Sequence, residues 1–122
     1  MIERFAQFPK ALAVRCRVAR FGDVPVLLAH PDWDSCVPVV LWLHGRTANK
    51  ELDPGRYLRW IRAGFAACAI DLPGHGERSV AAMQDPDATP DVLAQAVGEI
   101  DGVVEQLADR AWGGAPNNIP KL

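Results

Sequence analysis

The stretch Pro38–Arg46, which reads PVVLWLHGR, decides the fold of this chain. Residues Val39–Leu43 are all apolar and begin with two β-branched valines, and the run stops abruptly at His44 and Gly45. A short, continuous apolar run that ends at a glycine is typical of a strand buried on both faces, and such strands lie within mostly parallel sheets. Val39–Leu43 is therefore predicted to be an interior strand of a parallel sheet.

A second stretch of the same kind occurs at Phe65–Ile70, which reads FAACAI and leads into the sequence DLPGHGER at 71–78. Between the two apolar runs, Asp53 and Pro54 are favourable residues for a helix start, and Gly64 is typical of the position just after a helix end. Two buried strands separated by a helix form a parallel strand–helix–strand unit.

Other elements are predicted before this unit. Residues 1–10 are expected to form an edge segment or a loose arm. Leu12–Arg20 shows a largely alternating pattern and is predicted to be a half-solvated antiparallel strand. Val24–Ala29 is its expected hairpin partner, because Phe21-Gly22-Asp23 reads as a turn.

After the unit, residues 79–88 are expected to form an irregular linker, and a long helix is predicted from Thr89 to about Arg110. Its expected core-facing stripe recurs at steps of three and four and consists of Leu93, Val97, Ile100, Val104 and Leu107. Gly98 and Gly102 lie four residues apart in this helix, and a close approach to the sheet would explain them.

LHGR followed by DLPGHGER, each behind a predicted buried strand, resembles the first half of an α/β-hydrolase. The resemblance is to the single-domain esterase, dienelactone-hydrolase and serine-aminopeptidase branch, and it extends over residues 12–110. It implies an α/β fold class, namely a partial α/β-hydrolase fold with an N-terminal antiparallel hairpin followed by a parallel strand-helix-strand-helix unit. Residues 1–112 would be the N-terminal half of such a domain, and residues 113–122 an irregular C-terminal tail.

The resemblance also implies a site. The backbone at Arg46 and Gly45 would contribute to an oxyanion hole, in which an N–H group is aimed at developing negative charge. The remaining residues of the two motifs would line the mouth of the same site, namely His44, Thr47, Asp71, Gly74 and His75.

Several side chains near this site admit two interpretations. His44 is either a catalytic base or a brace for its loop, and the brace is favoured because the base of the family comes late in the chain; His75 is likewise expected to line the loop, and His30 to be a plain loop residue. Asp71 is expected to accept hydrogen bonds from loop N–H groups rather than to act as an acid. The Arg46 side chain is expected to point to solvent, with an acidic substrate group as the alternative.

Gly45 is explained either by a turn with positive φ or by close approach to an acyl group.

The nucleophile of the family is not found in this sequence. Its two serines, Ser35 and Ser79, lack the flanking glycines of a nucleophile elbow, and no cysteine is so flanked either. The tail carries Gly113-Gly114 and two prolines where the family has a fifth buried strand. The chain is therefore expected to be truncated before the elbow, to contain none of the catalytic triad, and to be inactive by itself.

The composition excludes several other classes of function. At 122 residues with 49% hydrophobic and 23% charged residues, the chain is a soluble domain in composition, and its net charge of −2 offers no field for nucleic acid. It has no apolar run of membrane-spanning length and no signal peptide. The three cysteines, 16, 36 and 68, form no C-x-x-C pair, so no metal or cofactor is expected and a reduced, cytoplasmic setting is favoured.

Two nucleotide-binding motifs were also compared with the sequence. The segment from Gly45 to Lys50 lacks the second glycine of a phosphate loop, and Gly74-His75-Gly76 lacks the third glycine of a dinucleotide fingerprint.

Three functions remain open at this stage. The first is a serine hydrolase that acts on small-molecule carboxylic esters or amides in the full-length relative. The second is an assembly or complementation module, a homodimer that forms through an exposed sheet edge. This edge is expected because the family places a fifth strand beside Val39–Leu43, which carries no charge or proline to protect it. The third is a complete small α/β domain of unrelated function.

Overall fold

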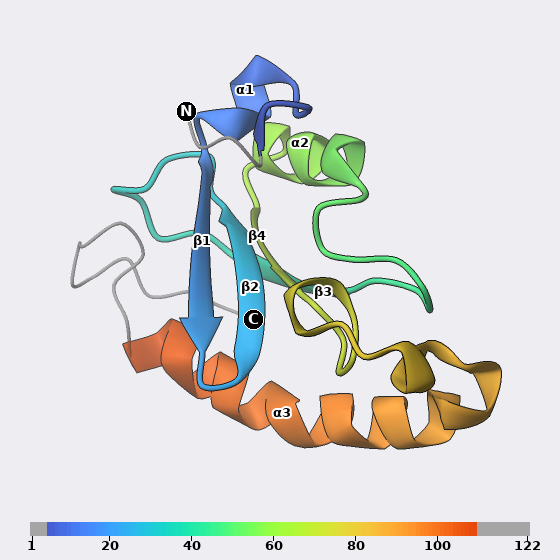
Figure 1. Cartoon of the computed structure of the whole chain (residues 1–122). Helices are drawn as coiled ribbons and strands as arrows, with labels where there is room; N and C mark the ends of the chain where they lie inside the picture. Colours follow the sequence, from blue (N-terminus) through green and yellow to red (C-terminus); the bar gives the residue numbers. More distant parts are fainter. Residues whose placement is uncertain (1–4, 110–122) are drawn as a thin grey trace.

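The computed structural model describes residues 5–109 and contains one four-stranded sheet with the strand order β1-β2-β4-β3 (Figure 1). The strands are β1 (Cys16–Phe21), β2 (Val24–Ala29), β3 (Val39–Leu43) and β4 (Ala66–Ile70). β2 pairs with β1 and β4 in antiparallel fashion, whereas β3 and β4 are parallel. The predicted hairpin and the predicted parallel pair are therefore both confirmed.

Helix α2 (Pro54–Arg62) connects β3 to β4 and confirms the predicted strand–helix–strand unit. Pro54 occupies the first turn, where its missing N–H costs nothing. Asp53 precedes the helix but does not cap it, because its carboxylate accepts a 2.7 Å hydrogen bond from Nε of Arg56 instead. At the other end Gly64 has a φ of +91°, and the N–H of Phe65 reaches back to the carbonyl of Trp60, as in a glycine-based helix ending.

The sheet is covered on both faces, because alternate residues of β4 point to opposite sides. Ala67 and Ala69 pack with α2 and with the N-terminal segment, in a cluster that includes Phe5, Leu12, Tyr57 and Ile61. Ala66, Cys68 and Ile70 pack on the opposite face, in a cluster that includes Val26, Val39, Val103 and Leu107. All five residues of β4 are buried, as expected for an interior strand.

The N-terminal segment differs from its prediction. Residues 10–13 form a short helix, α1 (Lys10–Ala13), rather than the beginning of a strand, and β1 starts only at Cys16. Nor are the described residues before α1 a loose arm, because Phe5 and Phe8 are buried and their rings stack with centroids 5.2 Å apart. Two phenylalanines in a polar stretch can anchor a segment even when it shows no periodic pattern.

Helix α3 (Thr89–Asp109) starts where it was predicted, but the predicted core stripe is largely wrong. Its buried residues are Val92, Ala96, Val103 and Leu107. Of the residues predicted to be buried, only Leu107 is, whereas Leu93 is 50% exposed and Val97 is 67% exposed. The helix therefore carries two apolar stripes, and the one with the smaller residues is buried, in part against the sheet and in part against Leu72.

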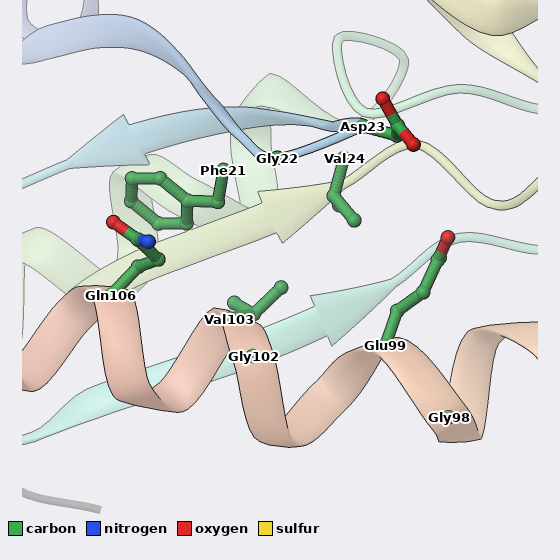
Figure 2. A pocket seen from close by; sticks show the side chains of 9 residues that line it. All are labelled: Phe21, Gly22, Asp23, Val24, Gly98, Glu99, Gly102, Val103 and Gln106. Carbon is green, nitrogen blue, oxygen red and sulfur yellow. The ribbon is translucent and has the colours of Figure 1, made fainter.

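The two glycines of α3 also differ from their prediction. A Cβ atom on either Gly98 or Gly102 would meet nothing within 4 Å, so neither permits a close approach of the helix to the sheet. Figure 2 shows both on the part of α3 that passes the β1–β2 turn, where they help to line an open cavity of about 280 Å³ with Gly22 and Glu99.

Strand β3 is the outermost strand of the sheet on its side, because within residues 5–109 its one strand neighbour is β4. Only Val39 of this strand is buried, and the other four residues are half-buried. Within the described residues β3 is therefore an edge strand. The predicted irregular tail lies outside the described residues.

The linker at 79–88 contains more order than predicted. Single turns of 3₁₀ helix occur at η2 (Gly76–Arg78), η3 (Ala81–Gln84) and η4 (Pro86–Ala88), so that the chain reaches α3 through a series of tight turns.

We expect Val103→Ala to lower the free energy of unfolding by about 2 kcal/mol, because it removes buried methyl groups from the β4–α3 interface. The matched control is Val14→Ala at a position that is 63% exposed, where a change within about 0.5 kcal/mol is expected. Urea unfolding followed by circular dichroism measures both. Equal losses in the two variants would contradict the assignment of the covered stripe.

Candidate functional site

The loop after β3 turns sharply at the residues predicted to form an oxyanion hole. The N–H of Ala48 donates to the carbonyl of Gly45 over 3.1 Å, and Oγ1 of Thr47 donates to the carbonyl of Arg46 over 2.6 Å. The residue with positive φ in this turn is Thr47, at +67°, and not Gly45. A threonine in the left-handed region is strained by about 1–3 kcal/mol, a cost that often accompanies functional loops.

Gly45 therefore does not serve the positive-φ turn that was one of its two predicted explanations. A Cβ atom at this position would meet no atom of the described chain within 4 Å. Its second explanation, close approach of an acyl group, stays a prediction.

Arg46 presents two different groups. Its backbone N–H donates a hydrogen bond to no group among residues 5–109, so it is available as a donor. Its side chain was expected to reach solvent, but although it is exposed, its Nη1 donates to the carbonyl of Gln84 over 3.1 Å. The side chain thus ties the loop after β3 to η3, while the backbone N–H remains unused.

His44 braces the loops that follow β3 and β4. The N–H of Leu72 donates to Nε2 of His44 over 3.0 Å, so Nε2 must carry a lone pair. In the neutral ring the proton then resides on Nδ1, which lies 2.7 Å from the carbonyl of Gly45 and donates to it. Both ring nitrogens are therefore engaged with backbone groups, an arrangement suited to a brace and not to a base.

Burial lowers the pKa of His44, and the neighbouring His75 and Lys50 add to this effect, against the opposing influence of Asp71 and the Gly45 carbonyl. His44 as a whole is 6% exposed, so its charged form would have almost no contact with water. The neutral tautomer that the hydrogen bonds require is thus also the form that the surroundings favour.

Asp71, at the end of β4, organises the second loop. Its Oδ1 accepts the N–H of Lys50 over 3.0 Å, and its Oδ2 accepts the N–H of Glu77 over 3.0 Å. Oδ2 also accepts a 2.6 Å hydrogen bond from Nζ of Lys50. Asp71 is fully buried, and both of its carboxylate oxygens accept hydrogen bonds, including those from loop N–H groups that the sequence predicted.

Lys50 is the residue that sequence reasoning missed. It is fully buried, and its three N–H donors are directed to Asp71, Glu77 and Glu51, with the Glu51 contact the longest at 3.2 Å. Burial alone would lower the pKa of Lys50, but the hydrogen bonds to these carboxylates outweigh it and raise the pKa. The carbonyl of Lys50 also accepts a 2.7 Å hydrogen bond from the hydroxyl of Tyr57 in α2.

Arg78 connects the loop after β4 to α3. Its Nη2 donates to the carbonyl of Asp71 over 2.7 Å, and its two terminal nitrogens bind the carboxylate of Glu99 in a bidentate pair at 2.8 Å. The guanidinium lowers the pKa of Glu99. The helix is thereby tied to the same loop that Lys50 holds from the other side.

His75 lies beside His44, with ring centroids 5.3 Å apart. Its Nδ1 lies 2.9 Å from the carbonyl of Pro73, and its buried Nε2 has no hydrogen-bond partner among the described residues. Gly74, one residue earlier, has a φ of +75°, and a Cβ atom there would lie 2.3 Å from Cβ of Met83. The loop is thus packed tightly against η3.

A cavity of about 120 Å³ opens between the two loops and the start of α3. Four of the predicted site residues line it together, namely His44, Gly45, Arg46 and His75. Its other lining residues are mostly apolar and are Leu72, Met83, Thr89, Val92 and Leu93. Three predicted lining residues, Thr47, Asp71 and Gly74, do not line this cavity.

The described residues that line this cavity offer hydrogen-bond donors and apolar surface, and the hydroxyl group among them is that of Thr89. Oγ of Ser35 donates to Asp32, and Oγ of Ser79 accepts from Gln84, and neither serine lines the cavity. Within residues 5–109 there is no group of three or more His, Cys, Asp or Glu placed to hold a metal ion. In the same part of the chain, none of the helices has the length and apolar character to cross a membrane.

We expect an NMR titration to give His44 a pKa below its ordinary value of 6.5, and its ¹⁵N shifts to identify the Nδ1–H tautomer. Because the unfolded chain takes up this proton at a higher pH, the stabilisation from neutral His44 is complete above about pH 6.5 and is lost as the pH falls towards the folded pKa. A midpoint above 6.5, or an Nε2–H tautomer, would contradict the brace.

Gly76 has a φ of +57°, and a Cβ atom there would lie 2.1 Å from Cγ of Asp71. Gly76→Ala is therefore expected to cost about 3 kcal/mol or more, since it combines backbone strain with displacement of the buried carboxylate. The control is Gly22→Ala, where φ is +61° but the space is open, and about 1 kcal/mol is expected. Thermal and urea unfolding compare them, and similar losses would show that Asp71 is not fixed as described.

The comparisons with known proteins rest on structure. No protein-family model matches the sequence, and no curated protein matches it. The chain is similar to the crystal structure of TT1662 from Thermus thermophilus, with 27% identity and a TM-score of 0.54, over 81% of this chain and 43% of that one. It also matches a thioesterase domain from the curacin biosynthetic pathway, with 30% identity and a TM-score of 0.48, over 78% of this chain and 32% of that domain.

The chain thus spans less than half the length of each of these two solved structures. The antiparallel hairpin and the parallel pair of strands agree with the fold that the resemblance implied. The described residues have an α/β-hydrolase-like fold, over the part of that fold which the chain spans.

Proposed function

We propose that this chain supplies the oxyanion-binding half of a serine hydrolase that acts on carboxylic esters or amides. The observation that carries the proposal is the uncommitted backbone N–H of Arg46, which stands at a largely apolar cavity just after the carboxyl end of β3. In open α/β sheets, ligands bind outside the carboxyl ends of the strands.

The chemistry follows from the position of this donor. When an ester or amide carbonyl is attacked, negative charge develops on its oxygen, and an N–H group that is already aimed at this oxygen stabilises the transition state. One such donor is typically worth about 3 kcal/mol, or a factor of about 100 in rate. The apolar residues Leu72, Val92 and Leu93 would receive the acyl chain of the substrate.

The loop that carries the donor is held from two sides, which supports this role. His44 binds the carbonyl of Gly45 and the N–H of Leu72, and Asp71 binds the N–H of Lys50 at the far end of the loop. A donor stabilises a transition state only if its direction is fixed before the reaction, so such bracing is what an oxyanion hole requires.

The catalytic serine of the proposed hydrolase would come from outside this sequence. Ser35 and Ser79 do not line the cavity, and neither is flanked by glycines. His44 and His75, the histidines at the cavity, have no serine beside them to activate. The 122-residue chain is accordingly proposed to bind the acyl group but not to turn over esters by itself.

The proposal is tested with a chimera that joins residues 5–109 to the part of the Thermus thermophilus protein that lies beyond the matched segment, with the intact parent protein as reference. We expect the folded chimera to hydrolyse p-nitrophenyl butyrate, whereas the isolated chain does not. In the chimera, Arg46→Pro removes the N–H donor and should lower kcat by about 100-fold. Arg46→Ala retains the donor and should cost no more than several-fold.

Three results would contradict the proposal. The first is turnover by the isolated chain that is sensitive to a serine-directed inhibitor, since this would place a nucleophile within the 122 residues. The second is equal activity of the Arg46→Pro and Arg46→Ala chimeras. The third is a chimera that unfolds cooperatively but has no activity while the parent protein is active.

A further inference from the structure

The N–H of Arg46 and the carbonyl of Gly45 are the two ends of one peptide group. Peptide groups are planar and almost always trans, and no cis peptide bond occurs among the described residues, so this N–H points opposite to that carbonyl. Among residues 5–109 the N–H has no acceptor that would hold it at its own end. Its direction is therefore set by the groups that hold the carbonyl of Gly45.

Two donors hold the carbonyl of Gly45. The N–H of Ala48 donates to it over 3.1 Å, and Nδ1 of His44 donates to it over 2.7 Å. The bond from Ala48 lies within the turn that contains Thr47, so it fixes the shape of the turn but not its orientation relative to the sheet. The bond from the buried ring of His44 is the shorter of the two.

The other ring nitrogen of His44 gives this turn a reference outside itself. Nε2 accepts the buried N–H of Leu72 over 3.0 Å, and Leu72 follows closely after the end of β4. All five residues of β4 are buried, so the core of the protein fixes the place of this N–H. Because an imidazole ring is rigid, its two hydrogen bonds transmit the position of β4 to the carbonyl of Gly45.

We propose that His44 is the positioning residue of the oxyanion donor, because it holds the Gly45 carbonyl and thereby aims the N–H of Arg46 from the opposite end of the same peptide group. The two ring nitrogens have different tasks: Nδ1 aims the donor, and Nε2 anchors the ring to the loop after β4. This role goes beyond bracing, since a brace holds two loops together without determining the direction of any one group.

The catalytic consequence of this role rests on the proposed function, whereas the direction of the N–H is a property of the chain alone. Two substitutions at position 44 separate the tasks of the two ring nitrogens. In His44→Asn the side-chain amide nitrogen stands as many bonds from the backbone as Nδ1 does, so the donor to Gly45 is kept and the acceptor for Leu72 is lost. In His44→Gln the amide oxygen replaces Nε2 as the acceptor, and the donor to Gly45 is lost.

The first measurement is the direction of the Arg46 N–H in the whole 122-residue chain, obtained from residual dipolar couplings of the backbone amides with the β4 amides as reference. We expect the wild type and His44→Asn to share one direction. His44→Gln should turn the N–H by more than about 20°, which exceeds the tolerance of a productive site. Circular dichroism shows whether both variants are folded.

The second measurement is the hydrolysis of p-nitrophenyl butyrate by the same two variants of the chimera described above. A donor that is aimed at developing negative charge acts in the transition state, so its misdirection lowers kcat and leaves KM nearly unchanged. We expect kcat of the His44→Gln chimera to lie about tenfold or more below that of the His44→Asn chimera. Their KM values should agree within about threefold.

An unchanged N–H direction in His44→Gln would overturn the inference, and so would one altered direction shared by both variants, because the ring would then act only by its bulk. The wild type alone provides a further check that needs no substitution: its Arg46 N–H should be rigid, with an NMR order parameter of about 0.85, and a value below about 0.6 would overturn the inference. If the direction depends on His44 as expected but kcat does not, the inference on direction stands and the oxyanion role of Arg46 fails.

Discussion

The buried ammonium group of Lys50 is held by three carboxylates, of which that of Asp71 is fully buried and those of Glu51 and Glu77 are partly exposed, and the arrangement of the site depends on this ion cluster. Breaking a buried ion pair by removing one partner typically costs about 3–5 kcal/mol, because a charge remains buried without compensation. The cluster joins the loop after β3 to the loop after β4 through Asp71, and it reaches α2 through the hydroxyl of Tyr57. Two loops that are separate in sequence are thereby held at a fixed distance.

Much of this fold could be predicted from the sequence, because its decisive parts have strong local patterns. Val39–Leu43 and the run ending at Ile70 are short, continuous apolar runs that indicate strands, and Pro54 and Gly64 mark the ends of the helix between them. The site could be predicted only in part. The sequence indicated which loops meet, and four of its seven site residues do line one cavity, but the buried cation at Lys50 has no local sequence signal.

Helix α3 shows why the rest could not be predicted. Its sequence contains two apolar stripes, and the one with the larger residues was the reasonable choice for the core. The buried stripe is instead the one that begins with Val92 and Ala96, which pack with Leu72, and that continues with residues packed on β4. The ion pair between Arg78 and Glu99 holds the helix in this rotation. An ion pair between residues 21 positions apart is a tertiary contact, and no periodicity within the helix reports it.

The hydrogen bond between Arg46 and Gln84 affects how a ligand would enter and leave the cavity. Gln84 receives the guanidinium of Arg46 on its carbonyl and uses its side-chain amide to bind Gly74 and Ser79. Gln84 therefore connects the loop after β3 to the loop after β4, and a ligand larger than the opening would have to break these hydrogen bonds to enter. Variation of the side chain at position 46 would then alter how fast molecules enter and leave the cavity.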